Sequence, residues 1–468
     1  MAADAPMRDT IDHIRANARS LLSACQCEYA EIRLVASTGT SISLSGKEIE
    51  VFSSGDIVGG SVRVLNNGAW GFISFNDMTD IERYFRRGIA ISSSVRTPVK
   101  TKIRRYGTVR QHFATETGMD FRDISLEEKF SLISNYNRIL KSSPRIQTTR
   151  AAYRDVHSYY AYLNSEGSDI TYDRAYCGIS LSSIARDGAA IQPYGDSVSG
   201  YGGFDIVQGR DEMAECVAKT SVDLLKAESV PGGTYRVVAD QKLAGVFIHE
   251  AFGHLSEADF VHENEKLRSM MVIGKKFGPE ELTVIDNGNM PGFSGYIPFD
   301  DEGVIPSGTH LIKHGLLHGR LHSRETAEKM GEETTGNGRA IGVMNQPIVR
   351  MTNTYIENGV HDRGAIMEAA GDGIYAAGVI GGETNLEMFT FTSGYGHEIK
   401  NGKIGKMYKD IVLTGNVFTT LQNIEMIGND RRMFGGLGGC GKGGQSPLPV
   451  SFGGPHLLIK DVLIGGAR

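Results

Sequence analysis

Two histidines and a glutamate lie close together in the run GVFIHEAFGHLSEADF, residues 245–260. Glu250 directly follows His249, and His254 comes four residues after the glutamate. Imidazole nitrogens bind zinc, and an adjacent carboxylate can take a proton from a metal-bound water. The pattern therefore favours a zinc site with His249 and His254 as ligands and Glu250 as general base. The alternative is an ordinary buried helix whose histidines are hydrogen-bonded.

The spacing of the two histidines is unusual for a metal-binding helix. His249 and His254 are five residues apart, so on an ideal α-helix their side chains point roughly 140° away from each other. A π-bulge adds one residue to a turn and would bring the two rings back to one side. Gly253 tolerates such a distortion. We therefore expect a helix that is distorted between the two histidines.

A zinc site needs a third protein ligand, and the sequence offers near and distant candidates. Glu257 and Asp259 follow the second histidine, and Glu257 would share its face on a continuing helix. Cys440 lies far along the chain, in the glycine-rich run FGGLGGCGKGGQS. A thiolate suits zinc, although a cysteine there can also be a small residue in a tight loop, or a nucleophile paired with a histidine. The residues alone leave this choice open.

Other patterns in the chain carry weaker signals. The glycine run nearly matches a phosphate-binding loop, but Gly443 stands where a hydroxyl is needed for magnesium. Four histidines recur every fourth residue, yet intervening glycines predict a hairpin rather than a helix; they are His310, His314, His318 and His322. His397-Glu398 precedes an Asn-Gly turn and reads as part of a hairpin. None of these patterns predicts a second site.

Length, charge and composition limit the classes of function. A chain of 468 residues predicts two or three structural units. Its net charge of −6 does not indicate the basic surface that nucleic-acid binding requires. No apolar run approaches the roughly 20 residues that span a bilayer, and the N-terminal residues lack the pattern of a secretory signal. Five cysteines show no disulfide-dense spacing. We expect a protein of the reducing cytoplasm, without membrane or nucleic-acid partners.

Hydrophobic periodicity and turn signals predict an α+β fold. In the first half they predict antiparallel sheets with helices, including a strand meander over 29–75 whose turns fall at Thr38-Gly39, Ser54-Gly55 and Asn67-Gly68. The helices are expected over 8–24, 79–92, 125–141 and 209–227. The second half reads as glycine-rich and mostly β, with the distorted histidine helix and a short helix at 323–329.

A proline-glycine stretch at 230–233 predicts a domain boundary. We expect an N-terminal α+β domain at 1–230, with an alternative division into units of about 1–120 and 121–230. Residues 231–468 would form the C-terminal domain that carries the histidines and Cys440.

Longer motifs in the second half resemble one known family. They are TTGNGRA (334–340), RMTNTYIENG (350–359), GIYAAGVIGGETN (373–385) and MIGNDRRMFGGLGGCGKGGQSPLPVSFGGP (426–455). Together with the histidine run they resemble the TldD branch of the TldD/PmbA family of metallopeptidases. The likeness covers nearly all of 230–468 and is looser in the N-terminal half, and Gly443 and Gly444 stand where many relatives have a bulkier residue.

The resemblance implies a zinc-dependent peptidase. His249 and His254 match the family's metal-binding histidines, Cys440 matches the cysteine that completes the set, and Glu250 matches the catalytic glutamate. The substrates would be unfolded or extended peptides, hydrolysed by metal-activated water with the glutamate as base. The family's other branch, PmbA (or TldE), lacks the metal motif and acts as a partner subunit, so we expect a homodimer or a heterodimer with such a paralogue.

Two other functions stay open beside the peptidase. The chain could be a non-hydrolytic, metal-binding subunit that holds peptides for a partner, although binding alone does not need Glu250. The chain could also be a regulator of a DNA enzyme, a function suggested by a name sometimes given to this family. The acidic net charge disfavours direct contact with DNA.

Overall fold

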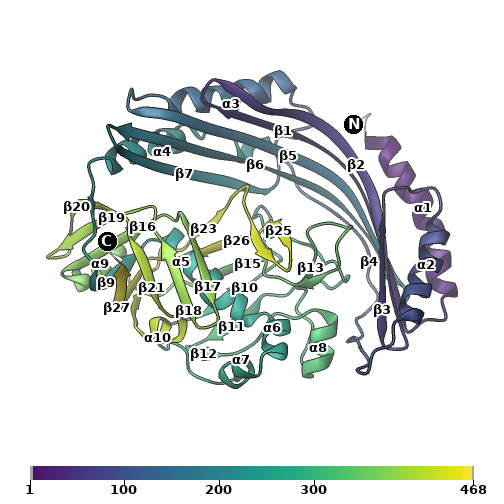
Figure 1. Cartoon of the computed structure of the whole chain (residues 1–468). Helices are drawn as coiled ribbons and strands as arrows, with labels where there is room; N and C mark the ends of the chain where they lie inside the picture. The colour runs from purple at the N-terminus through teal and green to yellow at the C-terminus, as the bar shows by residue number, and fades with distance from the viewer. Residues whose placement is uncertain (1–3, 466–468) are drawn as a thin grey trace.

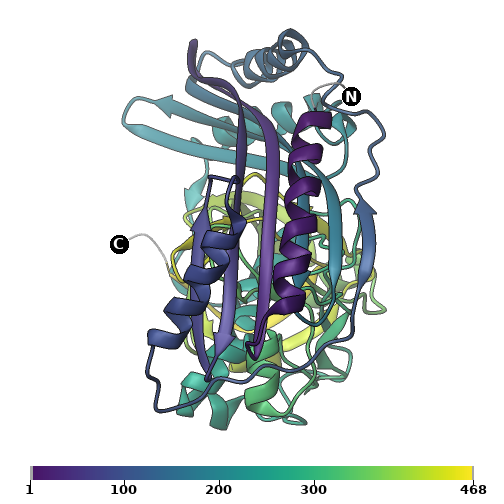
Figure 2. The ribbon, with the colours of Figure 1, turned by 90° about the vertical axis from the view of Figure 1, so that its right-hand side faces the viewer.

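A long curved sheet from the first half of the chain arches over the second half (Figure 1). The structure is a computed structural model and describes residues 4–465. The concave face of the sheet turns toward the second half, and helices cover its outer face; two of these, α1 and α2, lie side by side across it in Figure 2. The expected α+β class is confirmed.

The arch is one seven-stranded sheet with the order β3-β2-β1-β5-β6-β4, in which β7 also pairs with β6. Neighbouring strands are antiparallel, except that β4 runs parallel to β6. Its strands are β1 (Tyr29–Ser45), β2 (Glu48–Asn66), β3 (Ala69–Phe75), β4 (Arg110–Ala114), β5 (Ile146–Asn164), β6 (Asp169–Asp187) and β7 (Ala190–Tyr201). The prediction of several sheets and a short meander is thus replaced by one sheet of long strands.

Two of the turns expected in the meander do not exist. Gly39 and Gly55 face each other in register in the middle of β1 and β2. A Cβ at Gly39 would lie 2.7 Å from the carbonyl oxygen of Asp155 on β5, so this glycine permits close strand packing. The observed turns lie at Gly46 and at Asn67-Gly68, which have positive φ.

Four helices supply the apolar contacts of the outer face. They are α1 (Asp4–Ala24), α2 (Ile81–Ser94), α3 (Leu126–Leu140) and α4 (Asp211–Leu224), close to the predicted ranges. The first two pack on one end of the sheet and the last two on the other. Ser125 and Glu128 form the predicted capping box of α3. Cys25 and Cys27, after α1, are joined by a disulfide that the sequence did not predict.

The second half contains two larger sheets and two hairpins. A ten-stranded sheet has the order β17-β18-β21-β27-β9-β16-β19-β20-β8 with β22 also on β27, and a six-stranded sheet has the order β12-β11-β10-β15-β26-β23. The strands are β8 (Glu228–Ser229), β9 (Gly233–Ala239), β10 (Val284–Asp286), β11 (Thr309–Lys313), β12 (Leu316–Leu317), β13 (Gly338–Arg339), β14 (Ile348–Val349), β15 (Asn353–Ile356), β16 (Gly373–Ala377), β17 (Gly381–Asn385), β18 (Met388–Thr392), β19 (Tyr395–Lys400), β20 (Lys403–Lys409), β21 (Val412–Asn416), β22 (Ile424–Ile427), β23 (Arg432–Gly435), β24 (Cys440–Lys442), β25 (Gln445–Leu448), β26 (Ser451–Gly454) and β27 (Leu457–Gly465).

Short helices accompany these strands. They are α5 (Gln241–Ile248), α6 (Ala258–Glu263), α7 (Glu265–Met270), α8 (Arg324–Met330), α9 (Arg363–Ala370) and α10 (Val417–Gln422), with a 3₁₀ turn at His254–Ser256. A further 3₁₀ turn, Phe204–Ile206, follows β7 in the first half. Of these, α5 and α8 were predicted, and α5 contacts strands of both larger sheets. None of the helices in residues 4–465 is long and apolar enough to cross a membrane.

Charged groups fix the arch to the second half. Arg63 on β2 forms ion pairs with Glu31 at 2.8 Å and with Glu302 at 2.7 Å, and all three side chains are buried. Tyr160 on β5 donates a hydrogen bond to Asp301 at 2.8 Å. Buried ion pairs depend strongly on geometry, so they fix the position of one half on the other. The domain boundary near residue 230 stays a proposal, and β8, just before it, pairs with β20.

Candidate metal centre

One extra residue in a helical turn brings the two histidines together. Helix α5 begins at the cap of Asp240, whose side chain accepts a hydrogen bond from the Leu243 amide at 2.7 Å. The chain then forms a π-helical turn at His249–Gly253, in which the His254 N–H donates to the His249 carbonyl. The ring centroids of the two histidines are 5.6 Å apart. The predicted distortion is therefore present, in π form.

Close packing holds this helix in place. A Cβ at Gly245 would lie 2.7 Å from the Cα of Gly453 on β26, so only glycine allows this backbone approach. A Cβ at Gly253 would lie 2.1 Å from the sulfur of Met351. Gly253 has an ordinary helical φ of −58°. Glycine is thus required at this position because Met351 packs against it, and not because the π-helical turn needs a positive φ.

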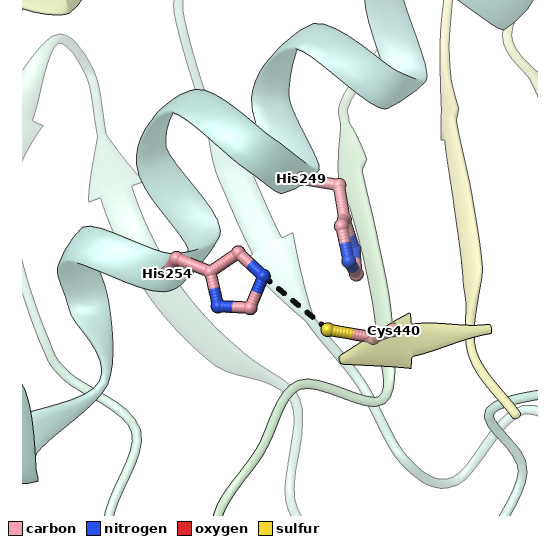
Figure 3. A group of neighbouring side chains, drawn as sticks. All are labelled: His249, His254 and Cys440. Atoms are coloured by element: carbon pink, nitrogen blue, oxygen red, sulfur yellow. Dashed lines mark hydrogen bonds between the residues drawn. The ribbon is translucent and has the colours of Figure 1, made fainter. Parts of the chain in front are cut away.

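Cys440 reaches the histidines from a hairpin that is distant in the sequence. Its Sγ lies 3.3 Å from Nε2 of His254 (Figure 3). One donor atom each from His249, His254 and Cys440 lie within 4.8 Å of one another. Arg350 binds the backbone of the hairpin, donating to the Cys440 carbonyl at 2.7 Å and to the Gln445 carbonyl at 3.1 Å. Arg350 thereby binds both strands of the hairpin.

The donor set and its spacing fit a zinc ion. Zinc bonds of about 2.3 Å to sulfur and 2.0–2.1 Å to nitrogen, at a tetrahedral angle, place the two donor atoms about 3.5 Å apart. The Cys440–His254 separation of 3.3 Å is close to this value. Nδ1 of His249 is buried and has no hydrogen-bond partner among the residues that the structure describes. One of the two ring nitrogens of this buried histidine is thus left without a partner.

Glu257 and Asp259, which the sequence offered as third ligands, lie behind the donor set. Oε2 of Glu257 accepts a hydrogen bond from Nδ1 of His254 at 3.0 Å. Lys442 contacts both acids, at 3.0 Å from Glu257 and 2.7 Å from Asp259. The chain leaves helical geometry after the 3₁₀ turn, at Glu257, so the expected continuing helix is wrong. A carboxylate behind an imidazole fixes its tautomer and leaves Nε2 free to bind a metal.

Electrostatics favour the zinc-binding form of the cysteine. Burial alone would raise the pKa of the Cys440 thiol, but hydrogen bonds and positive charge from His249 and His254 lower the pKa to about 5. Burial lowers the pKa of His254, whereas Glu257 and Cys440 together raise this pKa well above its usual value. Cys440 is therefore a thiolate at neutral pH, which is the form that coordinates metals.

Glu250 borders the same group of side chains. Its Oε2 lies 3.7 Å from Nε2 of His254, on the side that is partly open to solvent. The side chain is 28 % exposed, whereas His249 is almost fully buried. Glu250 thus has access both to water and to the edge of the donor set.

The other sequence motifs lie elsewhere and have ordinary roles. Among residues 4–465, the His/Cys/Asp/Glu side chains that group closely enough for a metal are those of His249, His254 and Cys440. His310 and His318 face each other across the predicted hairpin of β11 and β12. His322 hydrogen-bonds Glu332 at 3.0 Å. The contacts of Lys442 and Arg350 near the ligands were not predicted, because no spacing rule relates residues so far apart.

Comparison with known proteins assigns the chain to a family. The profile of the PmbA/TldA metallopeptidase C-terminal domain matches residues 232–466, that of the central domain matches 120–227, and that of domain 1 matches 30–92. The chain belongs to the TldD/PmbA family of metallopeptidases. This confirms the resemblance seen in its motifs.

Alignments with individual relatives of the TldD/PmbA family cover most of the chain. A metalloprotease of Synechocystis sp. is 41 % identical over 94 % of this chain and 95 % of its own length. A zinc metalloprotease TldD homolog of Saccharolobus solfataricus is 29 % identical over 94 % and 96 %. The crystal structure of TldE from Thermococcus kodakarensis has a TM-score of 0.77 at 15 % identity, covering 98 % and 100 % of the two chains. The last likeness concerns the fold.

The carboxylate of Glu257 gives a direct test of the contacts behind His254. We predict that Glu257→Gln weakens zinc binding by about 10- to 100-fold, because the neutral amide no longer orients His254 or balances Lys442. Competition with a chromophoric zinc chelator at fixed pH measures the affinity. The matched control is Glu263→Gln, an exposed glutamate of α6, which should bind zinc like the wild type. A change below twofold in the Glu257 variant would contradict this role.

Proposed function

We propose that the protein is a zinc-dependent peptidase that hydrolyses peptide bonds of unfolded or extended peptides. The observation that carries this proposal is the approach of His249, His254 and Cys440 to within 4.8 Å, with the carboxylate of Glu250 beside them. Membership in a metallopeptidase family and the name of the Saccharolobus relative support the same chemistry.

The two imidazoles and the thiolate would hold the ion. A zinc ion bound there supplies Lewis acidity toward a water molecule and toward the scissile carbonyl. Three protein ligands leave room in a four-coordinate sphere, as catalytic zinc sites require. The thiolate favours zinc over magnesium or manganese, which prefer oxygen ligands.

Glu250 would move the proton during hydrolysis. Its carboxylate would accept a proton from the attacking water and return that proton to the leaving amine. The partly exposed side chain can reach a substrate, whereas Glu257 is buried and committed to His254 and Lys442. We therefore assign the base to Glu250 and a positioning role to Glu257.

An extended substrate agrees with the surroundings of the site. Strand β17 is an edge strand of the ten-stranded sheet and lies against the π-helical turn. A peptide pairing with such an edge would be held through its backbone, with little sequence preference. The arch above the second half would hinder the approach of a folded protein (Figure 1).

Replacing Glu250 tests the peptidase and its alternative together. We predict that Glu250→Gln keeps one zinc ion per chain and lowers kcat on an unfolded peptide by at least about 100-fold, because the amide cannot accept a proton. Metal content by mass spectrometry and peptide cleavage by chromatography measure the two quantities. Full activity of a contaminant-free Glu250→Gln preparation would remove Glu250 from the base role. An inactive wild type that holds zinc and binds peptides would favour the non-hydrolytic subunit.

A dimeric assembly is also part of the proposal, with either a second copy or a TldE-like paralogue as partner. Apolar side chains on β2 are exposed, among them Ile49 at 55 % and Ile57 at 68 %. Apolar residues grouped on one strand face often mark an interface between proteins. We predict a dimer by multi-angle light scattering at micromolar concentration, either of the chain alone or after mixing with the paralogue. A monomer under both conditions would contradict the assembly.

A further inference from the structure

A cavity of about 620 Å³ lies between the concave face of the arch and the second half. This volume is typical of pockets that bind small molecules or parts of peptides. On the side of the arch it is lined by several small residues: Ser37, Gly39 and Ser41 on β1, and Gly55 on β2. The opposite wall includes residues 339–344 and 447–449.

Arg174 on β6 stands in this cavity within a frame of tyrosine rings. Its guanidinium carbon lies 5.6 Å from the ring centroid of Tyr201, 5.9 Å from that of Tyr172 and 6.0 Å from that of Tyr160. One of its amino groups donates to the Tyr201 hydroxyl at 2.7 Å. The guanidinium has five N–H donors, and within residues 4–465 it forms no ion pair with a carboxylate.

The acidic groups of the cavity already have donors of their own. Asp155 forms an ion pair with Lys129 at 2.6 Å. Asp300 accepts hydrogen bonds from the amides of Glu302 and Val304, both at 2.9 Å, and from the Gly338 amide at 2.8 Å. Asp301 accepts hydrogen bonds from Tyr160 and from the Ala340 amide, both at 2.8 Å, and pairs with Arg33 at 3.3 Å. These carboxylates are therefore engaged, and none of them forms an ion pair with Arg174; the charge of Asp301 acts on the guanidinium only from a longer distance.

A second arginine of the cavity wall adds to the positive charge. Arg339 is buried and donates to two backbone carbonyls, one of which is that of Pro449 at 2.9 Å. Within the described part of the chain it too forms no ion pair, and Asp301 and Asp286 act on it only from a longer distance. A buried guanidinium without a counter-ion is costly, so an anionic occupant would stabilise this arrangement.

The cavity shares a wall with the metal centre. Leu448 lines the cavity and pairs in register with Cys440 across the hairpin of β24 and β25. Antiparallel partners have Cα atoms about 4.5–5.5 Å apart. A group held in the cavity therefore lies beside the strand that carries the sulfur ligand.

We propose that this cavity is a subsite for a carboxylate of the peptide substrate, with Arg174 as its receptor. The inference rests on the proposed peptidase function and adds a substrate feature to it. Arginine recognises carboxylates through two parallel hydrogen bonds, and the tyrosine frame holds the guanidinium ready for this contact. The carboxylate can be the C-terminal group of the peptide or the side chain of an aspartate or glutamate.

Three peptides of one sequence separate the two sources of the carboxylate. The first has a free C-terminus and no acidic side chain, the second is its C-terminal amide, and the third is the amide with one glutamate. Their dissociation constants are measured by fluorescence anisotropy with zinc-loaded Glu250→Gln protein, after mass spectrometry shows that the labelled peptides stay intact. We expect the second peptide to bind at least about tenfold more weakly than the better of the other two.

Substitutions then assign the effect to Arg174. Arg174→Gln should abolish the preference for the carboxylate, and Arg174→Lys should keep part of it. The matched control is Arg186→Gln, an exposed arginine on the same strand whose side chain bonds the Gly188 carbonyl. Its preference should equal that of the parent protein.

The outcomes distinguish this inference from the proposed function. Equal binding of the three peptides to the parent protein, binding of none, or a preference retained in folded Arg174→Gln overturns the subsite. If Arg174→Gln does not fold, the comparison of peptides on the parent protein and on Arg174→Lys decides. Cleavage by the wild type without any carboxylate preference would leave the peptidase intact, whereas a preference without cleavage by the wild type would overturn the peptidase alone.

Discussion

The direction of two imidazole rings depends on one backbone hydrogen bond. Because the His254 amide donates to the His249 carbonyl, the turn holds one more residue than an α-helical turn, and side chains five apart share a side. A regular α-helix with this sequence would point them apart. The neighbours of the turn leave little room for that alternative, since Gly253 packs against Met351 and α5 lies directly on β26.

The third donor shows why both ends of the second half must fold together. Cys440 lies on the hairpin of β24 and β25, which forms a separate two-stranded sheet. Side chains from other elements therefore set the position of this hairpin. Arg350 binds the hairpin backbone, while Lys442, two residues beyond the cysteine, contacts the acids behind His254. The same lysine and Glu257 link the helix to the hairpin, so displacement of one element disturbs the other. The arch extends over the second half, including strand β25 of this hairpin (Figure 1).

The sequence predicted local features better than distant contacts. The cap at Ser125, the hairpin around His314 and the distorted histidine turn depend on neighbouring residues, and all three are present. Turn signals failed at Gly39 and Gly55, where glycine serves close packing inside long strands. Among the three candidates for the third donor, residue spacing could not choose. The choice of Cys440 came from family resemblance, and its contacts come from packing across the fold.

The central claim is that two imidazoles and one thiolate bind a single zinc ion. X-ray absorption at the zinc K-edge of the purified protein tests it most directly, because sulfur and nitrogen ligands differ in distance and scattering. We predict one sulfur at about 2.3 Å and nitrogen or oxygen ligands at 2.0–2.1 Å, with imidazole features in the spectrum. The sulfur contribution should disappear in Cys440→Ser. A wild-type spectrum without sulfur, or sulfur that persists in this variant, would contradict the account.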